Sequence, residues 1–354
     1  MRLHGFGHAP GTHCGSTSLR NLATYHGWGF DESTCFGLAS GLGFNYREPA
    51  ESPHRMFVGR PIWLERAFFD NLGIETTDRE SENFETAWAE VRERLDGGDP
   101  VMAFVDLYYL DYYDTSTHFA PHSLLLVGYD EDADASEAPN ADPDAGTGVV
   151  YTSDSEFEEV QSLPLSSLRA AWASDAVVPL SNRYLVPEGD PTVPVGEATE
   201  RAIRTTATYM LDPEASRYPL WPGATHGLAG IRALADDLPS WTELPDPGWT
   251  ARFAYQNVER RGTGGGAFRG LYAPFLASVE EAVGLEGFGD RMHAIAEGWT
   301  AVGGTLREAS EADDVSALPS SLESVSESVH ELADGERTLY EDTLAALGPA
   351  GPDP

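Results

Sequence analysis

The chain has 354 residues, of which 41% are hydrophobic and 23% charged, a composition typical of a folded protein with enough material for two domains. It carries 58 acidic residues against 22 basic ones, giving a net charge of −36, and every basic residue is arginine because the sequence contains no lysine. Lysine chemistry, such as a Schiff base or a P-loop lysine, is therefore excluded. Nucleic acid is a poor partner, because its phosphates would meet a repulsive field.

We interpret the acidic composition as the solvated surface of a halophilic, haloarchaeal-type protein, because near 1 M salt the Debye length shrinks to about 3 Å and screens the self-repulsion. The sequence has neither an 18-residue apolar run nor a signal-peptide pattern, so we expect a cytoplasmic protein with no membrane partner. The two cysteines, Cys14 and Cys35, cannot build a disulfide framework, and their spacing fits no zinc or redox motif.

The first half of the chain mixes helical and strand patterns. A helix is expected to begin directly at Cys14 and to end at Gly27, a plausible C-cap. Compact apolar runs predict strands at 101–110, 122–130 and 148–154. The acidic segment 131–146 is low in apolar residues and predicts a solvated hairpin loop between the last two strands.

The second half of the chain is mainly helical in its periodicity. A proline-rich stretch, 186–197, predicts a linker before it. Helices are then expected at 198–211, 226–237, 267–285, 288–302 and 318–346. The fold class that follows is α+β, with a mixed domain over 1–186 and an α-helical domain over 196–347.

Cys14 is the first candidate for chemistry. A loop containing glycine and proline precedes it and the predicted helix follows, so its sulfur is expected at a helix N-terminus. The unpaired N–H groups there, that of Gly15 included, favour an anion, which lowers the pKa of a thiol and can also stabilise an oxyanion. A cysteine taken alone is more often an inert buried residue. We interpret Cys35, in the apolar run TCFGLA, as a core residue.

His122 and Asp154 strengthen the catalytic interpretation of Cys14. His122 opens one predicted strand, and Asp154 follows the end of another. If the two strands pair as an antiparallel hairpin, the two side chains become neighbours. An imidazole oriented by a carboxylate and set against a thiolate is the logic of nucleophile, base and orienting group. Taken singly, His122 could merely begin a strand and Asp154 could begin a turn.

Several long segments resemble a known family. HCGSTSLRNLATYHG, STCFGLASGLGFNY, GRP at 59–61, HSLLLVGYD and VYTSD are similar to the amino-terminal domain of the butirosin biosynthesis protein H family. YQNVERRGTGGGAFRGLYAPFL resembles the signature of the helical domain that commonly follows it. The segments come in the family's order and together cover nearly the whole chain.

The resemblance implies a papain-like cysteine-nucleophile domain, akin to bacteriocin leader peptidases, followed by an α-helical domain. Cys14, His122 and Asp154 occupy the triad positions. The best-known member is an acyltransferase that moves an acyl group from a carrier-protein thioester to the amine of an aminoglycoside, an activity of one branch of the family. Related peptidases often place a glutamine several residues before the cysteine as oxyanion donor. This chain has His8 six residues before Cys14, so His8 becomes the candidate donor.

Further residues are candidates for substrate binding. Tyr46 and Arg60 are expected near the pocket. A glycine-rich segment with three arginines could hold a phosphate or carboxylate, such as that of phosphopantetheine, through Arg260, Arg261, Gly264, Gly265, Gly266 and Arg269. The alternative for this segment is a tight interhelical turn whose arginines pair with the abundant carboxylates.

A metal site and a dinucleotide site are both poor fits. Five histidines lie in two short stretches of sequence, but Pro121 interrupts the His-x3-His spacing at 118 and 122, and there is no HExxH or CxxC motif. The glycines of GLASGLGF do not match the dinucleotide fingerprint. We therefore expect neither a metal nor a resident cofactor, and a phosphopantetheine thioester enters only as a substrate.

The leading hypothesis is an acyltransferase that forms an acyl-enzyme on Cys14 from a thioester and passes the acyl group to an amine of a small molecule or peptide. An acyl carrier protein is one donor that the resemblance implies. A cysteine peptidase or amidase and a non-catalytic ligand-binding protein are the alternatives. The oligomeric state, a homo-oligomer included, is left open.

Overall fold

The computed structural model describes residues 1–311 and 318–349, and the chain forms two compact units. The first unit combines Met1–Cys35 with Gly73–Thr192, and the second combines Phe36–Leu72 with Val193–Pro354. The two predicted domains, 1–186 and 196–347, are each one continuous segment of the chain. In the structure, the segment 36–72 instead belongs to the same unit as the later helices. The physical reason is a small sheet in which strands from that segment pair with a strand near residue 225.

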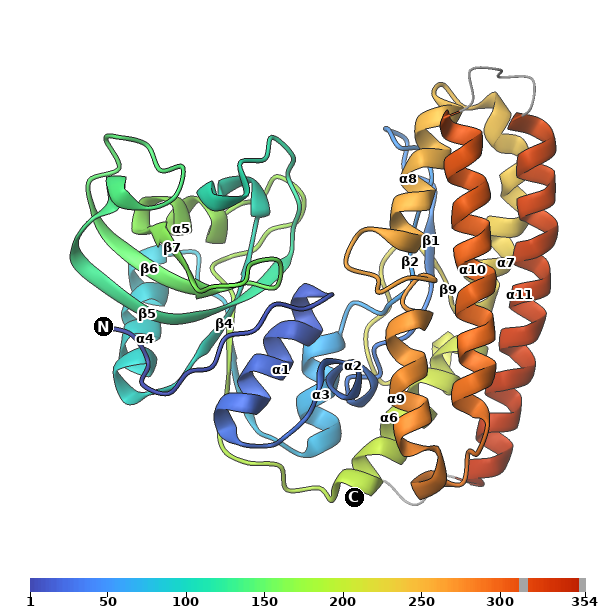
Figure 1. The fold of residues 1–354 in the computed structure, drawn as a ribbon, viewed down its shortest axis with the longest axis horizontal. Coiled ribbons are helices and arrows are strands. Elements are labelled where there is room, and N and C mark those ends of the chain that lie inside the picture. Colours follow the sequence, from blue (N-terminus) through green and yellow to red (C-terminus); the bar gives the residue numbers. More distant parts are fainter. Residues whose placement is uncertain (312–317, 350–354) are drawn as a thin grey trace. The chain divides into compact units, whose positions relative to one another are not determined.

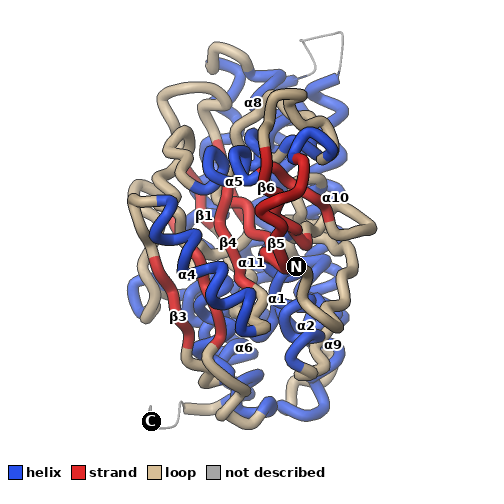
Figure 2. The backbone as a smooth tube through the Cα atoms, turned by 90° about the vertical axis from the view of Figure 1, so that its left-hand side faces the viewer, coloured by secondary structure: helices blue, strands red, loops and turns tan. Residues whose placement is uncertain are grey.

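The first unit is built around a six-stranded antiparallel sheet with the order β3-β8-β4-β5-β6-β7. Its strands appear in red in Figure 2, where β3, β4, β5 and β6 are labelled. Their bounds are β3 Thr76–Arg79, β4 Val101–Val105, β5 His122–Asp134, β6 Thr147–Ser153, β7 Gln161–Pro164 and β8 Tyr184–Pro187. Every residue of β4 is buried, as expected for a strand at the centre of a sheet.

Helix α1 (Cys14–His26) lies against β5 in this unit (Figure 1). Leu19, Leu22 and Ala23 are fully buried, and full burial of a leucine side chain contributes about 1.5 to 3 kcal/mol. Gly27 ends the helix at a φ of 76°, in the left-handed region that glycine adopts without strain. The predicted helix is confirmed at both ends. The other helices that begin in this unit are α2 (Glu32–Leu38), α4 (Phe84–Gly97) and α5 (Leu165–Trp172).

The hairpin expected between residues 122 and 154 is confirmed. Strands β5 and β6 pair in antiparallel fashion, with Leu125 opposite Ser153. The strand predicted over 101–110 is wrong in its second half, because β4 stops at Val105. The buried Asp106 accepts a hydrogen bond from the backbone N–H of Tyr108 and starts two short 3-10 turns instead.

The second unit is mainly helical and also contains a three-stranded sheet with the order β2-β1-β9. The strands are β1 (Asn45–Arg47), β2 (Met56–Val58) and β9 (Thr225–His226). The helices are α3 (Leu64–Leu72), α6 (Val195–Leu211), α7 (Gly227–Asp237), α8 (Pro247–Glu259), α9 (Arg269–Val283), α10 (Phe288–Glu311) and α11 (Leu318–Leu347). The α+β class is confirmed, and the five helices predicted after residue 196 are all present, whereas α8 was not predicted.

Within the part of the chain that the structure describes, no helix is both long enough and apolar enough to cross a bilayer.

Candidate active site

Cys14 is the first residue of α1, and the loop before it is held by one carboxylate. Glu32, the first residue of α2, accepts hydrogen bonds from the backbone N–H groups of Thr12 and His13 and from the hydroxyls of Ser16 and Thr17. A carboxylate with several hydrogen-bond donors is a strong anchor. The loop therefore fixes where the helix begins, and with it the position of Cys14, a partly exposed residue.

The first turn of α1 leaves donors near the sulfur. The N–H groups of Ser16 and Thr17 both donate to His13, to its ring Nδ1 and its carbonyl respectively. Among the described residues, no accepting group is found for the N–H groups of Cys14 and Gly15. These are the first orphan donors of the helix, and donors of this kind can stabilise an oxyanion. The oxyanion role of Gly15 stays a prediction.

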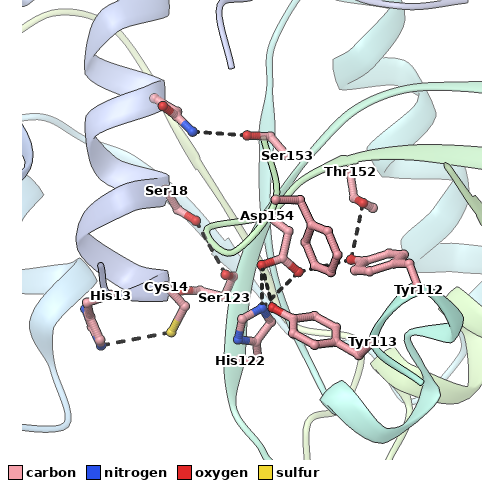
Figure 3. Close-up of polar contacts among 12 residues, drawn as sticks. His13, Cys14, Ser18, Tyr112, Tyr113, His122, Ser123, Thr152, Ser153 and Asp154 are labelled. Carbon is pink, nitrogen blue, oxygen red and sulfur yellow. Dashed lines mark hydrogen bonds and ion pairs between the residues drawn. The ribbon is translucent and has the colours of Figure 1, made fainter. Parts of the chain in front are cut away.

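His122 and Asp154 lie in direct contact across the hairpin. His122 opens β5, Asp154 follows β6, and the ring Nε2 is 3.0 Å from each carboxylate oxygen. Both residues are almost completely buried, with 3% and 1% of their surface exposed. Because a carboxylate only accepts, Nε2 carries the proton, and Nδ1 is the nitrogen left for other contacts. Figure 3 shows the ring of His122 between the Cys14 sulfur and the Asp154 carboxylate.

Two tyrosines that the sequence analysis did not single out complete the surroundings of Asp154. The hydroxyl of Tyr112 donates to Oδ2 and that of Tyr113 to Oδ1, each at 3.0 Å (Figure 3). Both come from the 3-10 turn Asp111–Tyr113, which directly follows the segment 101–110 that was predicted as strand. Their donors compensate the cost of burying a carboxylate.

The charges of the three side chains support one another. Burial alone would raise the pKa of the Cys14 thiol, but electrostatic interaction with the rings of His13 and His122, including a hydrogen bond from each, holds that pKa well below its usual value. Burial would lower the pKa of His122, whereas Asp154 and then Cys14 raise it well above the ordinary range. Burial would raise the pKa of Asp154, but His122 and the two tyrosines lower it, and the pKa of this carboxyl lies below its usual value. The favoured state is thiolate, imidazolium and carboxylate.

His8 is tied down on both sides. Its Nδ1 is 2.8 Å from the Ser153 hydroxyl, and its Nε2 is 2.7 Å from the carbonyl oxygen of Phe157. Because a carbonyl only accepts, Nε2 carries a proton that is already donated. His8 therefore anchors the end of β6 beside Asp154, and donating to an oxyanion would require it to give up that bond. The oxyanion role of His8 stays a prediction.

Tyr46 and Arg60 belong to the second unit. The buried Tyr46 donates its hydroxyl to Asp237 at 2.6 Å, and Asp237 also accepts from Arg55 and Trp241. Burial and the bond to Asp237 raise the pKa of Tyr46. Arg60 donates to the carbonyl of Pro61. Both side chains thus donate hydrogen bonds to other residues of the protein. That they line a substrate pocket stays a prediction.

The glycine-rich segment of the second unit matches the alternative interpretation, a tight turn. Gly264, Gly265 and Gly266 all have φ values between 56° and 86°, in the region that favours glycine. A Cβ at Gly266 would come within 2.6 Å of the carbonyl oxygen of Ala296. The N–H groups of Gly265 and Gly266 already donate to Thr263 and Glu259. The turn therefore explains these glycines without a bound anion.

The arginines of that segment are largely engaged by the protein. Arg269 is fully buried and forms a two-point ion pair with the buried Glu336, which also accepts from Trp299 and Tyr340. Arg261 donates to Gln256 and stacks on Phe253. Arg260 is exposed. The predicted phosphate cradle loses its main guanidinium, because Arg269 neutralises Glu336 instead.

Cys35 is fully buried, and burial raises its pKa well above the usual value, so its interpretation as a core residue is confirmed. Within residues 1–311 and 318–349, no group of three or more histidine, cysteine, aspartate or glutamate side chains is placed to hold a metal ion.

Two family models match the chain. The one described as Butirosin biosynthesis protein H, N-terminal, matches residues 13–136, and the one described as Domain of unknown function (DUF4872) matches residues 166–343, half of the chain. Cys14 and His122 fall within the first match, and Asp154 lies between the two. No curated protein matches the chain.

Proposed function

The chain belongs to the butirosin biosynthesis protein H-like family, with its papain-like domain followed by a DUF4872 helical domain, and on that premise we propose that it is a cysteine-dependent acyltransferase. The observation that carries the proposal is the thiol of Cys14 at a helix N-terminus, beside an imidazole that a buried carboxylate orients. The family description concerns biosynthesis, and we take this as support for a transfer reaction over proteolysis.

The first half of the reaction loads the cysteine. The Cys14 thiolate attacks the carbonyl carbon of a thioester, a new carbon–sulfur bond forms, and the carbonyl oxygen becomes an oxyanion facing the N–H groups of Cys14 and Gly15. The intermediate collapses, the donor's carbon–sulfur bond breaks, and the protonated His122 gives its Nδ1 proton to the departing thiolate. The products are the acyl-enzyme and a free thiol.

The second half passes the acyl group to an amine. The amine nitrogen attacks the acyl carbon, and His122 takes one amine proton on Nδ1. Collapse of the second intermediate breaks the bond to sulfur and returns the Cys14 thiolate and the His122 imidazolium. Asp154 keeps the ring oriented and stabilises its charge throughout. A phosphopantetheine thioester on a small molecule or a carrier protein supplies the required donor chemistry, and water in place of the amine would make the protein a hydrolase.

Acyl capture tests this proposal. The protein is mixed with an acyl-pantetheine thioester, quenched in acid and digested, and we expect the acyl mass on the peptide that contains Cys14. Addition of a primary amine should discharge the adduct faster than buffer alone and yield the amide. Discharge at the same rate with and without amine, yielding the free acid, would make the protein a hydrolase. No adduct with any thioester, ester or amide would contradict the cysteine mechanism and favour a binding protein.

A further inference from the structure

A second histidine lies beside the Cys14 sulfur. The Nε2 atom of His13 is 4.0 Å from Sγ, within hydrogen-bonding range for sulfur, and Figure 3 marks this contact with a dashed line. The side chain is buried, with 3% of its surface exposed. Adjacent residues seldom face each other on a helix, but His13 is the N-cap, with an extended backbone that turns its ring toward the first turn.

The helix cap fixes which nitrogen of His13 carries the proton. Nδ1 lies 3.2 Å from the backbone nitrogen of Ser16, which can only donate. Nδ1 must therefore be unprotonated, and the proton of the neutral ring sits on Nε2, the nitrogen that faces the sulfur. The two functions are coupled, because capping α1 through one nitrogen turns the other into a donor toward Cys14.

We propose that His13 is a thiolate-stabilising residue whose Nε2–H donates a hydrogen bond to the Cys14 sulfur while His122 exchanges the proton. This inference rests on the proposed function and adds a division of labour between the two imidazoles. His122 transfers protons between the thiol, the leaving group and the amine. His13 keeps its Nδ1 on the Ser16 N–H and turns its Nε2 toward the sulfur.

The donated bond acts at both chemical steps. It stabilises negative charge on sulfur before the attack and again when sulfur leaves the second intermediate, and it is weakened in the acyl-enzyme, where the sulfur is neutral. His13 therefore makes Cys14 a better leaving group toward the amine. A site with His122 alone would need the imidazolium to supply all of that stabilisation.

Other charges also act on this sulfur. His122 and His13 favour the thiolate, and Asp154 acts on it through His122. Glu156 and Cys14 repel one another, and Glu32 contacts the backbone N–H of His13 rather than its ring. Since a change at Glu32 would disturb the loop and a change at His122 would remove proton transfer, only a substitution at His13 isolates the proposed bond.

His13→Asn is the discriminating variant. The Asn Oδ1 accepts from the Ser16 N–H and keeps the cap, because asparagine is a favoured N-cap residue, but the shorter side chain loses the donor to sulfur. We measure iodoacetamide alkylation of Cys14 by peptide mass spectrometry across pH. The variant should alkylate about tenfold more slowly near pH 7, with its apparent pKa shifted upward, because a hydrogen bond to a charged group is lost. His13→Ala is the comparison that loses cap and donor together.

The outcomes separate this inference from the proposed function. A wild-type Cys14 that reacts no faster than an ordinary thiol contradicts the cysteine mechanism itself. A fast wild type with an unchanged pH profile in His13→Asn overturns the role of His13 alone. A second measurement uses the unmutated chain, so it does not depend on whether a variant folds. Nitrogen NMR of the imidazoles should show the proton of His13 on Nε2 and not on Nδ1. The opposite tautomer overturns the inference.

Discussion

Each unit of the protein buries charge, and the two do so in different ways. In the second unit, the guanidinium of Arg269 and the carboxylate of Glu336 are both fully buried, and Trp299 and Tyr340 supply further donors to the carboxylate. In the first unit, Asp154 is equally well supplied with donors, but the chain of contacts continues through His122 to the thiol of Cys14, a partly exposed residue. One network is closed on itself, and the other ends at a nucleophilic atom.

The comparison teaches where buried charge indicates chemistry. Arg269 drew attention in the sequence because arginine beside glycines can bind an anion, yet the structure gives it a protein carboxylate as its partner. Cys14 drew attention as a helix-terminal thiol, and its partners, His13 and His122, stabilise the thiolate, which is the nucleophilic form. The distinguishing property is a nucleophilic atom at the end of the network, not the density of charge.

The largest expected effect separates the two cysteines. Cys14→Ser should reduce acyl transfer by about 10⁴-fold, because the hydroxyl has a far higher pKa than the thiol, and should leave the free energy of unfolding nearly unchanged. Cys35→Ser is the matched control: it should keep transfer while lowering stability, since it places a hydroxyl at a fully buried position. Equal loss of activity in both variants would break the comparison.

Asp154→Asn should reduce transfer by about 10³-fold, because an amide neither orients His122 in the same tautomer nor stabilises its charge. The matched control is Asp106→Asn, which removes another buried carboxylate of the same unit, one bonded to His118 at 2.7 Å. Steady-state transfer rates check the pair. If both variants lose activity alike, the effect belongs to the folding of the unit and not to the site.

The closed network is expected to matter for stability only. Glu336→Gln leaves Arg269 buried without a countercharge and should lower the free energy of unfolding by about 3 kcal/mol. Denaturant unfolding measures this change, with Glu197→Gln as the control at an exposed pair with Arg201 that should have little effect. The rate of Cys14 alkylation should stay as in the wild type, and a fall would show that the two networks are linked.

The smallest effect sharpens the role of the tyrosines. Tyr113→Phe removes one of the two hydroxyls that donate to Asp154 and should lower the rate constant of transfer about tenfold without weakening substrate binding. Tyr109→Phe, in the neighbouring turn, is the control, because its hydroxyl is not a donor to Asp154. A rise in KM with an unchanged kcat would assign Tyr113 to substrate binding instead.

The sequence could predict the parts of the site that depend on strong local patterns. Cys14 stands between a glycine-containing loop and the amphipathic pattern of a helix. His122 and Asp154 lie at the ends of two clear strands, so the assumption that these strands pair was enough to place the two side chains next to each other. His13 could have been found from its place at the N-cap. Tyr112 and Tyr113 could not, because their run of strand-forming residues gives no sign that the buried Asp106 ends the strand.

The division into units was less predictable for a similar reason. Strands β1 and β2 have three residues each and β9 has two, too few for an alternating pattern to show. Their pairing is what ties the segment 36–72 to the later helices. The helices after residue 196 carry a full amphipathic period, and α6, α7 and α11 were predicted with nearly the observed bounds. The helix predicted over 288–302 is too short, because α10 continues to Glu311.

The most direct test of the central claim is the pH dependence of iodoacetamide alkylation, resolved for each cysteine by peptide mass spectrometry. Because the pKa of Cys14 is held down, its thiolate persists as the pH falls below the range of an ordinary thiol, whereas the raised pKa of Cys35 keeps that side chain protonated. Cys14 should label much faster than Cys35, with an apparent pKa below the usual value of about 8.5. Equally slow labelling of both cysteines would contradict an activated nucleophile at Cys14.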